Sequence, residues 1–112
     1  MRIAVVTHVM PYPADSGTRI RVARIVAALR RRHEVTLLSL ESGDSTEAAA
    51  ALGVPVAVHP ARVRRGLAPV AVTAETTAAV WRAVREWRAD AVHVEGTFGA
   101  AAAGLHLSLI HI

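Results

Sequence analysis

The chain contains no cysteine, and it has no lysine, asparagine or glutamine either. Without cysteine there is no disulfide framework and no thiolate metal site, which is compatible with a reducing cytoplasm. Aromatic residues make up only 4% of the 112 residues, so the interior must be built mainly from alanine, valine, leucine and isoleucine. A chain of this length accommodates one domain with one modest core.

Long apolar runs are absent as well. No stretch approaches the roughly 20 apolar residues that span a bilayer, and the N-terminal run is too short for a secretory signal. We therefore expect a cytoplasmic protein that meets a membrane only at its surface. All thirteen basic residues are arginines, and the net charge is +4. The arginines at 30–32 and 62–65 can contact anionic lipid at the inner face of the plasma membrane, although ordinary surface charge explains them too.

The first 40 residues predict a strand, a proline-bracketed loop, a helix and a second strand. The continuous apolar run at residues 3–6 is typical of a parallel strand covered on both faces. Pro11 and Pro13 exclude a helix before Asp15 or Ser16, either of which can cap the helix that follows. Its apolar positions at helical spacing are Ile20, Ala23, Val26, Ala27 and Leu29. The arginines at 30–32 suit a helix C-terminus, and residues 34–40 return as a strand, so this unit is βαβ with parallel strands.

The rest of the chain alternates in the same way. The predicted elements are a helix at 47–52, a strand at 54–58, an irregular segment at 60–69, a helix at 74–88, a strand at 91–95 and the start of a helix at 97–104. Asp44 or Ser45 can cap the first of these helices, and Gly53 can end it. Pro55 confines its strand to the edge of the sheet because proline cannot donate to a ladder. The residues that cap the long helix and form its apolar face are Thr73, Val80, Val84 and Trp87.

These elements predict an α/β fold: a Rossmann-like parallel sheet of about four strands in the order 3-2-1-4, with helices on both faces. Ligands of such sheets bind beyond the carboxyl ends of the strands, here between the first and fourth. We expect residues 1–104 to form one incomplete lobe. Residues 105–112 alternate like a closing strand, but residues 108–112 also resemble translated adapter sequence, which predicts that 105–112 is a non-native or frayed tail.

Two stretches carry a resemblance to a known family. The run MRIAVVTHVMPYPADSGTRIRVARIVAALRRRHEVTLLSL resembles the opening of family 4 glycosyltransferases of the GT-B architecture, and DAVHVEGTF resembles the fourth strand of the same lobe and the loop after it. The resemblance implies the N-terminal, acceptor-side lobe of an enzyme that moves a sugar from a nucleotide-sugar donor to a sugar or lipid-linked acceptor hydroxyl, with retention of configuration. The E-x7-E glutamates of the family's second lobe have no counterpart here, so we expect the fragment alone to be inactive.

The resemblance places the donor phosphate at Ser16, Gly17 and Thr18. Glycine at a helix N-terminus lets the backbone N–H groups and the helix dipole stabilise a diphosphate. The alternative is a tight strand-to-helix turn that would need the same glycine. The family often has two glycines in this loop, whereas Thr18 occupies the second position here, and its side chain narrows the approach of a phosphate.

His93 and Glu95 are the candidate catalytic residues. Strand alternation places both on one face near the end of the fourth strand, where a neutral imidazole can accept a hydroxyl proton. The alternative is a half-buried strand histidine that bonds to the backbone. Some relatives carry a second histidine where this chain has Glu95, so the pair is better described as polar residues of the acceptor lobe than as an established general base.

Three further residues are candidates for acceptor binding. His8 ends the first strand and points toward the cleft, while Arg19 and Arg21 lie in the first turns of the following helix. Histidines at loop entries and arginines on helices more often serve structure and solvation.

Other functional classes find less support. A Rossmann-like nucleotide-binding module is the main alternative, but the first turn lacks G-x-G-x-x-G. A receiver-like domain would need a cluster of acidic residues at the strand ends, whereas Asp15 is the single acidic residue in the loop after the first strand. The six histidines show no ligand spacing with carboxylates, and Ser16 lacks a nucleophile-elbow pattern, so we expect no metal, no cofactor and no hydrolase triad. Nucleic acid is not an expected partner.

Overall fold

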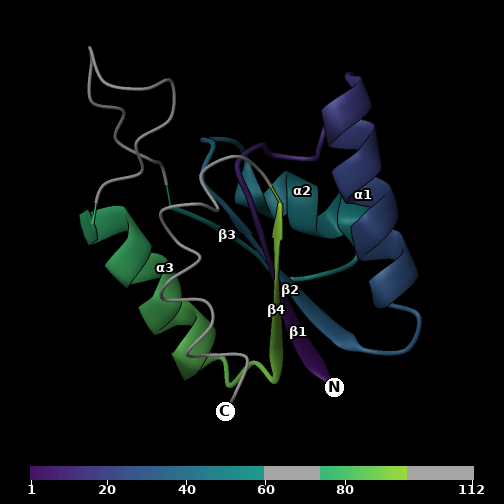
Figure 1. Ribbon diagram of the computed structural model, residues 1–112. Coiled ribbons are helices and arrows are strands. Elements are labelled where there is room, and N and C mark those ends of the chain that lie inside the picture. The colour runs from purple at the N-terminus through teal and green to yellow at the C-terminus, as the bar shows by residue number, and fades with distance from the viewer. Residues whose placement is uncertain (60–73, 96–112) are drawn as a thin grey trace.

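The computed structural model describes residues 1–59 and 74–95, with side chains from residue 77 onward in the second range. Its elements alternate between strand and helix (Figure 1). In chain order they are β1 (Arg2–Thr7), α1 (Gly17–Leu29), β2 (Glu34–Ser39), α2 (Ser45–Leu52), β3 (Val56–Val58), α3 (Ala74–Glu86) and β4 (Ala91–Glu95). Each lies within two residues of its predicted bounds at both ends. The irregular segment at 60–69, the cap at Thr73, the helix at 97–104 and the tail at 105–112 lie outside the described residues.

The four strands form one sheet in the order β3-β2-β1-β4, and every neighbouring pair is parallel. This confirms the predicted fold class and strand order. In the register, Val5 of β1 lies between Leu37 of β2 and His93 of β4. Because the chain moves outward from β1 to β3 and then returns to the other side of β1, the order reverses between β1 and β4. The carboxyl ends of these two strands therefore flank the expected ligand position.

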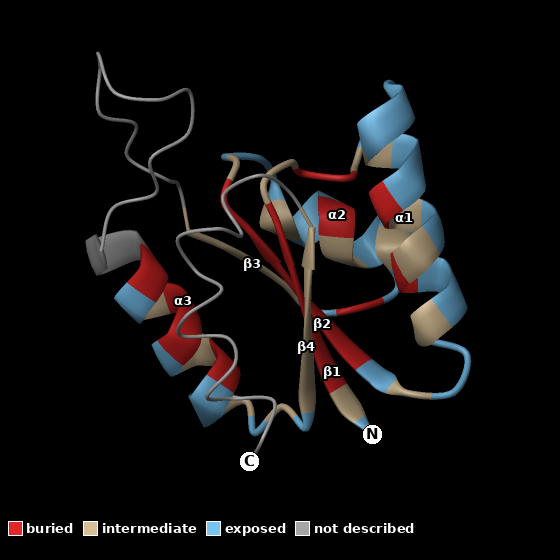
Figure 2. Cartoon of the chain, in the orientation of Figure 1, coloured by how far each residue is buried: buried red, intermediate tan, exposed pale blue. Residues whose placement is uncertain are grey.

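Helices cover both faces of the sheet, α1 and α2 on one and α3 on the other (Figure 1). Alternate side chains of each strand point to opposite faces, so the core divides into two clusters of buried residues (Figure 2). The cluster on the α1 side comprises Ile3, Val5, Val22, Val26, Val35, Leu37 and Val54. The cluster on the α3 side comprises Ala4, Val6, Leu38, Leu40, Val80, Trp81 and Val84.

The buried face of α1 differs from the predicted one. Val26 is buried as expected, but its partner is Val22, four residues earlier, while Ile20 is 38% exposed and Ala27 is exposed. Residues four apart lie on the same side of a helix, so Val22 and Val26 form one narrow contact with the sheet. Ile20 and Ala27 project away from this contact, so the apolar positions at helical spacing do not all face the sheet.

The helix ends follow the predicted cap chemistry. Ser16 is the N-cap of α1, and Asp44 is the N-cap of α2, where its carboxylate accepts a hydrogen bond from the Glu47 amide at 2.9 Å. Gly53 ends α2 in the left-handed region at φ 71°. In α3, Val80 and Val84 are buried as predicted, but the helix stops at Glu86, and half-buried Trp87 lies beyond it. None of the helices in the described ranges is both long and apolar enough to cross a bilayer.

Candidate functional site at the carboxyl edge of the sheet

Two buried hydroxyl side chains shape the loops that leave this edge. Thr7 and Ser39 are the last residues of β1 and β2, lie opposite each other in the register, and are fully buried. Each hydroxyl donates to the carbonyl two residues later, Thr7 to Val9 at 3.0 Å and Ser39 to Glu41 at 2.9 Å, and accepts from the amide of that same residue. These bonds turn both loops in the same way as they leave the sheet.

His93 and Glu95 form a direct pair on β4. His93 Nε2 lies 2.7 Å from Glu95 Oε1. The register with β1 places both side chains on the face that α1 covers. The Glu95 side chain is only 13% exposed, whereas that of His93 is 42% exposed. The structure thus brings together the two residues predicted to act jointly, with the carboxylate shielded and the imidazole accessible; their catalytic role stays a prediction.

Arg21 connects α1 to the end of β4. Its Nη2 lies 3.6 Å from Glu95 Oε2, although the arginine side chain is 70% exposed. Glu95 therefore contacts His93 through one oxygen and Arg21 through the other. Since Gly17 lies one helical turn before Arg21, this ion pair sets the first turns of α1 beside the end of β4.

His8 links the carboxyl ends of β1 and β4. Its amide donates to the Glu95 carbonyl at 3.3 Å, and its ring Nδ1 lies 3.2 Å from the same oxygen. Because a carbonyl oxygen can only accept, we assign the ring proton to Nδ1. The half-buried His8 therefore lies where the strand order reverses, as expected of a residue at the end of the first strand.

The N-terminus of α1 leaves the backbone accessible at Gly17. Ser16 Oγ accepts from the Arg19 amide at 3.4 Å, so the serine hydroxyl already serves as a cap. Gly17 does not have a positive φ, and a Cβ built on it meets no atom within 4 Å. Neither backbone conformation nor packing requires glycine here, which removes the tight-turn explanation. Thr18 beside it is exposed.

Arg19 is held by groups from two loops, the one after β1 and the one after β2. Its guanidinium donates to the Met10 carbonyl at 2.7 Å, forms a two-pronged ion pair with Glu41, and lies 3.3 Å from Asp15. Glu41 also accepts from the Met10 amide at 3.0 Å. The hydrogen bond from Arg19 lowers the pKa of Glu41, and the same bond raises the pKa of Arg19. Arg19 thus joins the loops after β1 and β2 to α1, while its predicted acceptor contact stays a prediction.

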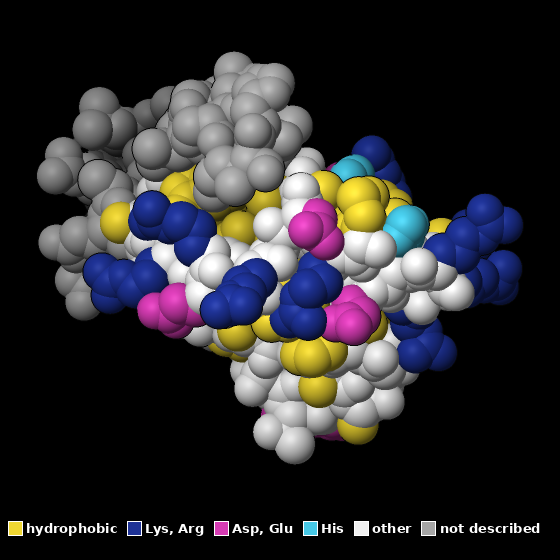
Figure 3. Space-filling model, turned by 90° about the horizontal axis from the view of Figure 1, so that it is seen from below, with side chains coloured by type: hydrophobic (Ala, Val, Ile, Leu, Met, Phe, Trp, Pro, Cys, Tyr) yellow, Lys and Arg dark blue, Asp and Glu magenta, His cyan; other side chains and the backbone are white. Residues whose placement is uncertain are grey.

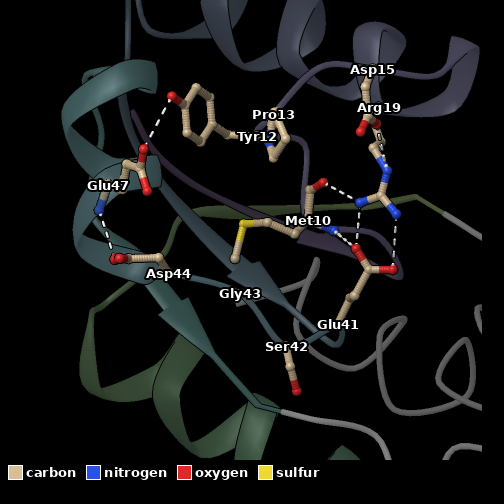
Figure 4. A pocket seen from close by; sticks show the side chains of 10 residues that line it. All are labelled: Met10, Tyr12, Pro13, Asp15, Arg19, Glu41, Ser42, Gly43, Asp44 and Glu47. Carbon is tan, nitrogen blue, oxygen red and sulfur yellow. Dashed lines mark hydrogen bonds and ion pairs between the residues drawn. The ribbon is translucent and has the colours of Figure 1, made fainter.

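A pocket of about 420 Å³ lies beside this ion pair, between the loops that follow β1 and β2 (Figure 4). Sequence reasoning did not identify it. Its lining residues are Met10, Tyr12, Pro13, Asp15, Arg19, Glu41, Ser42, Gly43, Asp44 and Glu47. The Tyr12 hydroxyl donates to Glu47 at 3.4 Å across the pocket. The only sequence signal was the cluster of turn and acidic residues at 41–47, whose approach to residues 10–15 depends on the fold.

No group of three or more histidine and acidic side chains able to hold a metal occurs within residues 1–59 and 74–95. The candidate site therefore consists of a histidine–glutamate pair, an accessible helix N-terminus and a polar pocket, all at one edge of the sheet.

Comparison with known proteins agrees with this arrangement. A family model described as "Glycosyl transferase 4-like domain" matches residues 16–112. The chain belongs to the glycosyl transferase 4-like family. The matched range includes the N-terminus of α1 and all of β4, and it begins after β1 and most of the following loop. The family predicted from the sequence is therefore confirmed.

A solved structure extends the likeness to the whole chain. The crystal structure of Acinetobacter baumannii MurG matches with a TM-score of 0.65 and 17% sequence identity, over 100% of this chain and 34% of the MurG chain. The likeness shows the shared fold, and the glycosyl transferase 4-like chain spans about a third of MurG's length. A search of curated proteins finds no significant match.

Proposed function

We propose that this lobe is the acceptor-side part of a retaining glycosyltransferase of glycan biosynthesis, acting in the cytoplasm. The enzyme would transfer a sugar from a nucleotide-sugar donor to the hydroxyl of a sugar or lipid-linked acceptor. The observation that carries the proposal is the Arg21–Glu95 ion pair, which joins the N-terminus of α1 to the His93–Glu95 pair in a chain of this family.

Ser16, Gly17 and Thr18 are the proposed contacts of the donor diphosphate. The open space at Gly17 supports this assignment, because beyond the helix's own backbone and the chain neighbours no atom lies within 4 Å of the position that a Cβ would take there. A helix N-terminus supplies N–H donors and a favourable dipole for such an anion. Catalysis gains when these donors stabilise the charge that develops as the sugar leaves.

His93, with Glu95 as its partner, is proposed to take up the proton of the acceptor hydroxyl. An ionised glutamate only accepts hydrogen bonds, so Glu95 holds the proton of His93 on Nε2. This leaves Nδ1 as the atom that can accept a proton from the acceptor hydroxyl. Arg21 stabilises the charge of Glu95 from the other side.

The acceptor would enter between His8, Arg19 and Arg21. Arg19 lines the pocket between the two loops, and His8 borders the end of β4, so both lie at the edge where the proposed chemistry takes place. The polar lining of the pocket suits a hydroxyl-rich acceptor. Because no E-x7-E pair is found in this chain, we propose that residues 1–112 alone transfer no sugar; detectable transfer by the purified chain would contradict this.

An NMR titration tests the phosphate site. The isotopically labelled chain is titrated separately with a uridine diphosphate sugar and with NAD, and amide shifts are followed at Gly17 and Thr18. We expect both residues to respond to the nucleotide sugar. Gly17→Val should abolish the response without unfolding the protein, because the added side chain enters empty space.

Ala28→Val is the matched control, because it adds the same type of side chain at an exposed position of α1. Its titration should equal that of the wild type. An unchanged response in Gly17→Val would reject the phosphate site. A response to NAD alone would favour a nucleotide-binding module without transferase activity.

A further inference from the structure

The end of the molecule opposite the candidate site carries an excess of positive charge. An open hollow of about 530 Å³ lies at the amino ends of the strands, lined by Met1, Arg2, Arg30, Arg31, Arg32, His33, Glu34 and Asp90. We call its four arginines the arginine face. Arg88 follows Trp87, whose carbonyl accepts from Arg2 at 3.0 Å, and so borders the same end.

The two carboxylates of the hollow are already engaged by one arginine. Arg2 forms an ion pair with Glu34 at 2.6 Å, and its backbone amide donates to Asp90 at 2.8 Å. The guanidinium of Arg2 also lies over the ring of Trp87, 4.1 Å from its centroid. The Arg2 guanidinium is therefore paired with Glu34 within the protein, whereas Asp90 is held by a neutral backbone amide.

Among the arginines at 30–32, a role in stabilising α1 accounts for Arg30 but not for Arg31 and Arg32. Arg30 is the C-cap of α1 and donates to the Gly53 carbonyl at 3.3 Å, so it joins two helices. Arg31 and Arg32 are exposed, and within the described ranges neither has an ion-pair partner. Their charges are thus available to a partner. Figure 3, which looks onto this end, shows dark-blue arginine side chains across the face and fewer magenta carboxylates.

We propose that the arginine face docks on an anionic lipid surface, with Arg31 and Arg32 contacting phosphate headgroups. Guanidinium groups bind phosphate oxygens through two parallel hydrogen bonds, and anionic leaflets attract such clusters. Met1, which is 65% exposed and lines the hollow, adds an apolar side chain beside the charges. An apolar side chain beside cations suits a bilayer interface, where it can enter the boundary between headgroups and acyl chains.

This docking would set the orientation of the enzyme. Arg2 begins β1 and Thr7 ends it, so a bilayer beneath the arginine face lies at the opposite end of the strands from the candidate site. The acceptor edge would then face away from the lipid, so this orientation fits the sugar acceptor of the proposed function and not the lipid-linked one. This consequence rests on the proposed function, whereas the docking itself does not.

Vesicle co-sedimentation tests the docking. The purified chain is mixed with vesicles of phosphatidylcholine alone or of phosphatidylcholine with phosphatidylglycerol. We expect binding only to the anionic vesicles, with loss at high salt. Arg31→Glu and Arg32→Glu should each weaken binding about fivefold or more.

Arg24→Glu is the matched control. Arg24 is exposed on α1, and its reversal changes the net charge by the same amount as Arg32→Glu without touching the hollow. We expect less than a twofold effect. An effect equal to that of Arg32→Glu would show that the vesicles bind through net charge alone and not through the arginine face, and this would overturn the proposal.

Three other outcomes would also overturn it. The first is no binding to anionic vesicles by the wild type. The second is equal binding of inorganic phosphate, seen as NMR shifts at Arg31 and Arg32 that vesicles do not compete away, which would indicate a soluble anion. The third is displacement of the vesicles by a nucleic-acid oligonucleotide at equal charge concentration. None of these results bears on the nucleotide-sugar titration, so the two proposals fail separately.

Discussion

The two ends of the parallel sheet use charge in different ways. At the carboxyl end, Arg19 and Arg21 are each paired with a glutamate, and these pairs tie α1 to loops and strands that are distant in sequence. At the amino end, Arg31 and Arg32 are exposed, and the four arginines of the hollow outnumber its two carboxylates. The arginines at the carboxyl end therefore hold a defined site together through ion pairs, whereas Arg31 and Arg32 at the amino end are exposed to solvent.

The two ends also differ in whether the local structure requires the glycine found there. Gly53, beside Arg30 at the amino end, has φ 71° and lacks space for a Cβ, which would lie 2.1 Å from Arg30 Nη1. Gly17, at the carboxyl end, has neither constraint. The first glycine is explained by the backbone, whereas the second leaves room for a ligand.

The largest predicted effect is that of Gly53→Ala. An L-residue in the left-handed region costs about 1–2 kcal/mol, and the end of the Arg30 side chain must also move. We expect urea denaturation to show a loss of that size in the free energy of unfolding. Gly17→Ala should change it by less than about 0.5 kcal/mol, because alanine is tolerated in a helix. Equal losses would remove the distinction between the two glycines.

The second prediction concerns the ion pair at the carboxyl end. Glu41→Gln removes the charge opposite Arg19 and weakens the bond to the Met10 amide. Because both side chains are partly exposed, we expect a loss of about 1 kcal/mol rather than the full value of a buried charged bond. The hydrogen exchange of the Met10 amide should become faster. Unchanged stability and exchange would show that the pair does not hold the two loops.

The third prediction is a dependence of stability on acid. The pKa of Glu41 lies below its ordinary value of 4.5 in the folded protein. The carboxylate therefore contributes stability that is complete above that value and is lost as the pH falls through the lowered one. Urea midpoints measured between neutral pH and pH about 3 should fall less steeply for Glu41→Gln than for the wild type. Parallel curves would contradict the assignment.

The smallest effect is expected at the amino end. Glu34→Gln breaks the ion pair with Arg2, but the side chain of Glu34 is 70% exposed. Exposed pairs contribute little, so the free energy of unfolding should change by less than about 0.5 kcal/mol. A loss larger than that of Glu41→Gln would reverse the proposed difference between the two ends.

Much of the fold could be predicted because its signals are local. The apolar runs, Ser16, Asp44 and Gly53 define strands and helix ends by chemistry that acts over a few residues. The alternation that placed His93 and Glu95 on one face is equally local, and their contact follows from it. The buried face of α1 was only partly predicted, since several apolar positions compete and the sheet selects Val22 with Val26.

The candidate site was less predictable because its contacts span the chain. Arg19 resembles a solvated helix arginine in sequence. Its contact with Asp15 is local, but only the approach of residues 10 and 41 gives it the Met10 and Glu41 partners. The pocket beside it depends on the same approach. Arg21 and Glu95 are more than 70 residues apart, and no periodicity links them.

The sequence by itself determined the alternation of strands and helices and the residues that cap them, because backbone preference and burial act on short segments, and this alternation in turn predicted the strand order. Tertiary structure alone decided which charged side chains are paired at the carboxyl end and which stay exposed at the amino end. The reason is that a parallel sheet gathers the ends of distant strands at one edge, and the partners of a charge are set by that meeting rather than by its neighbours in the chain.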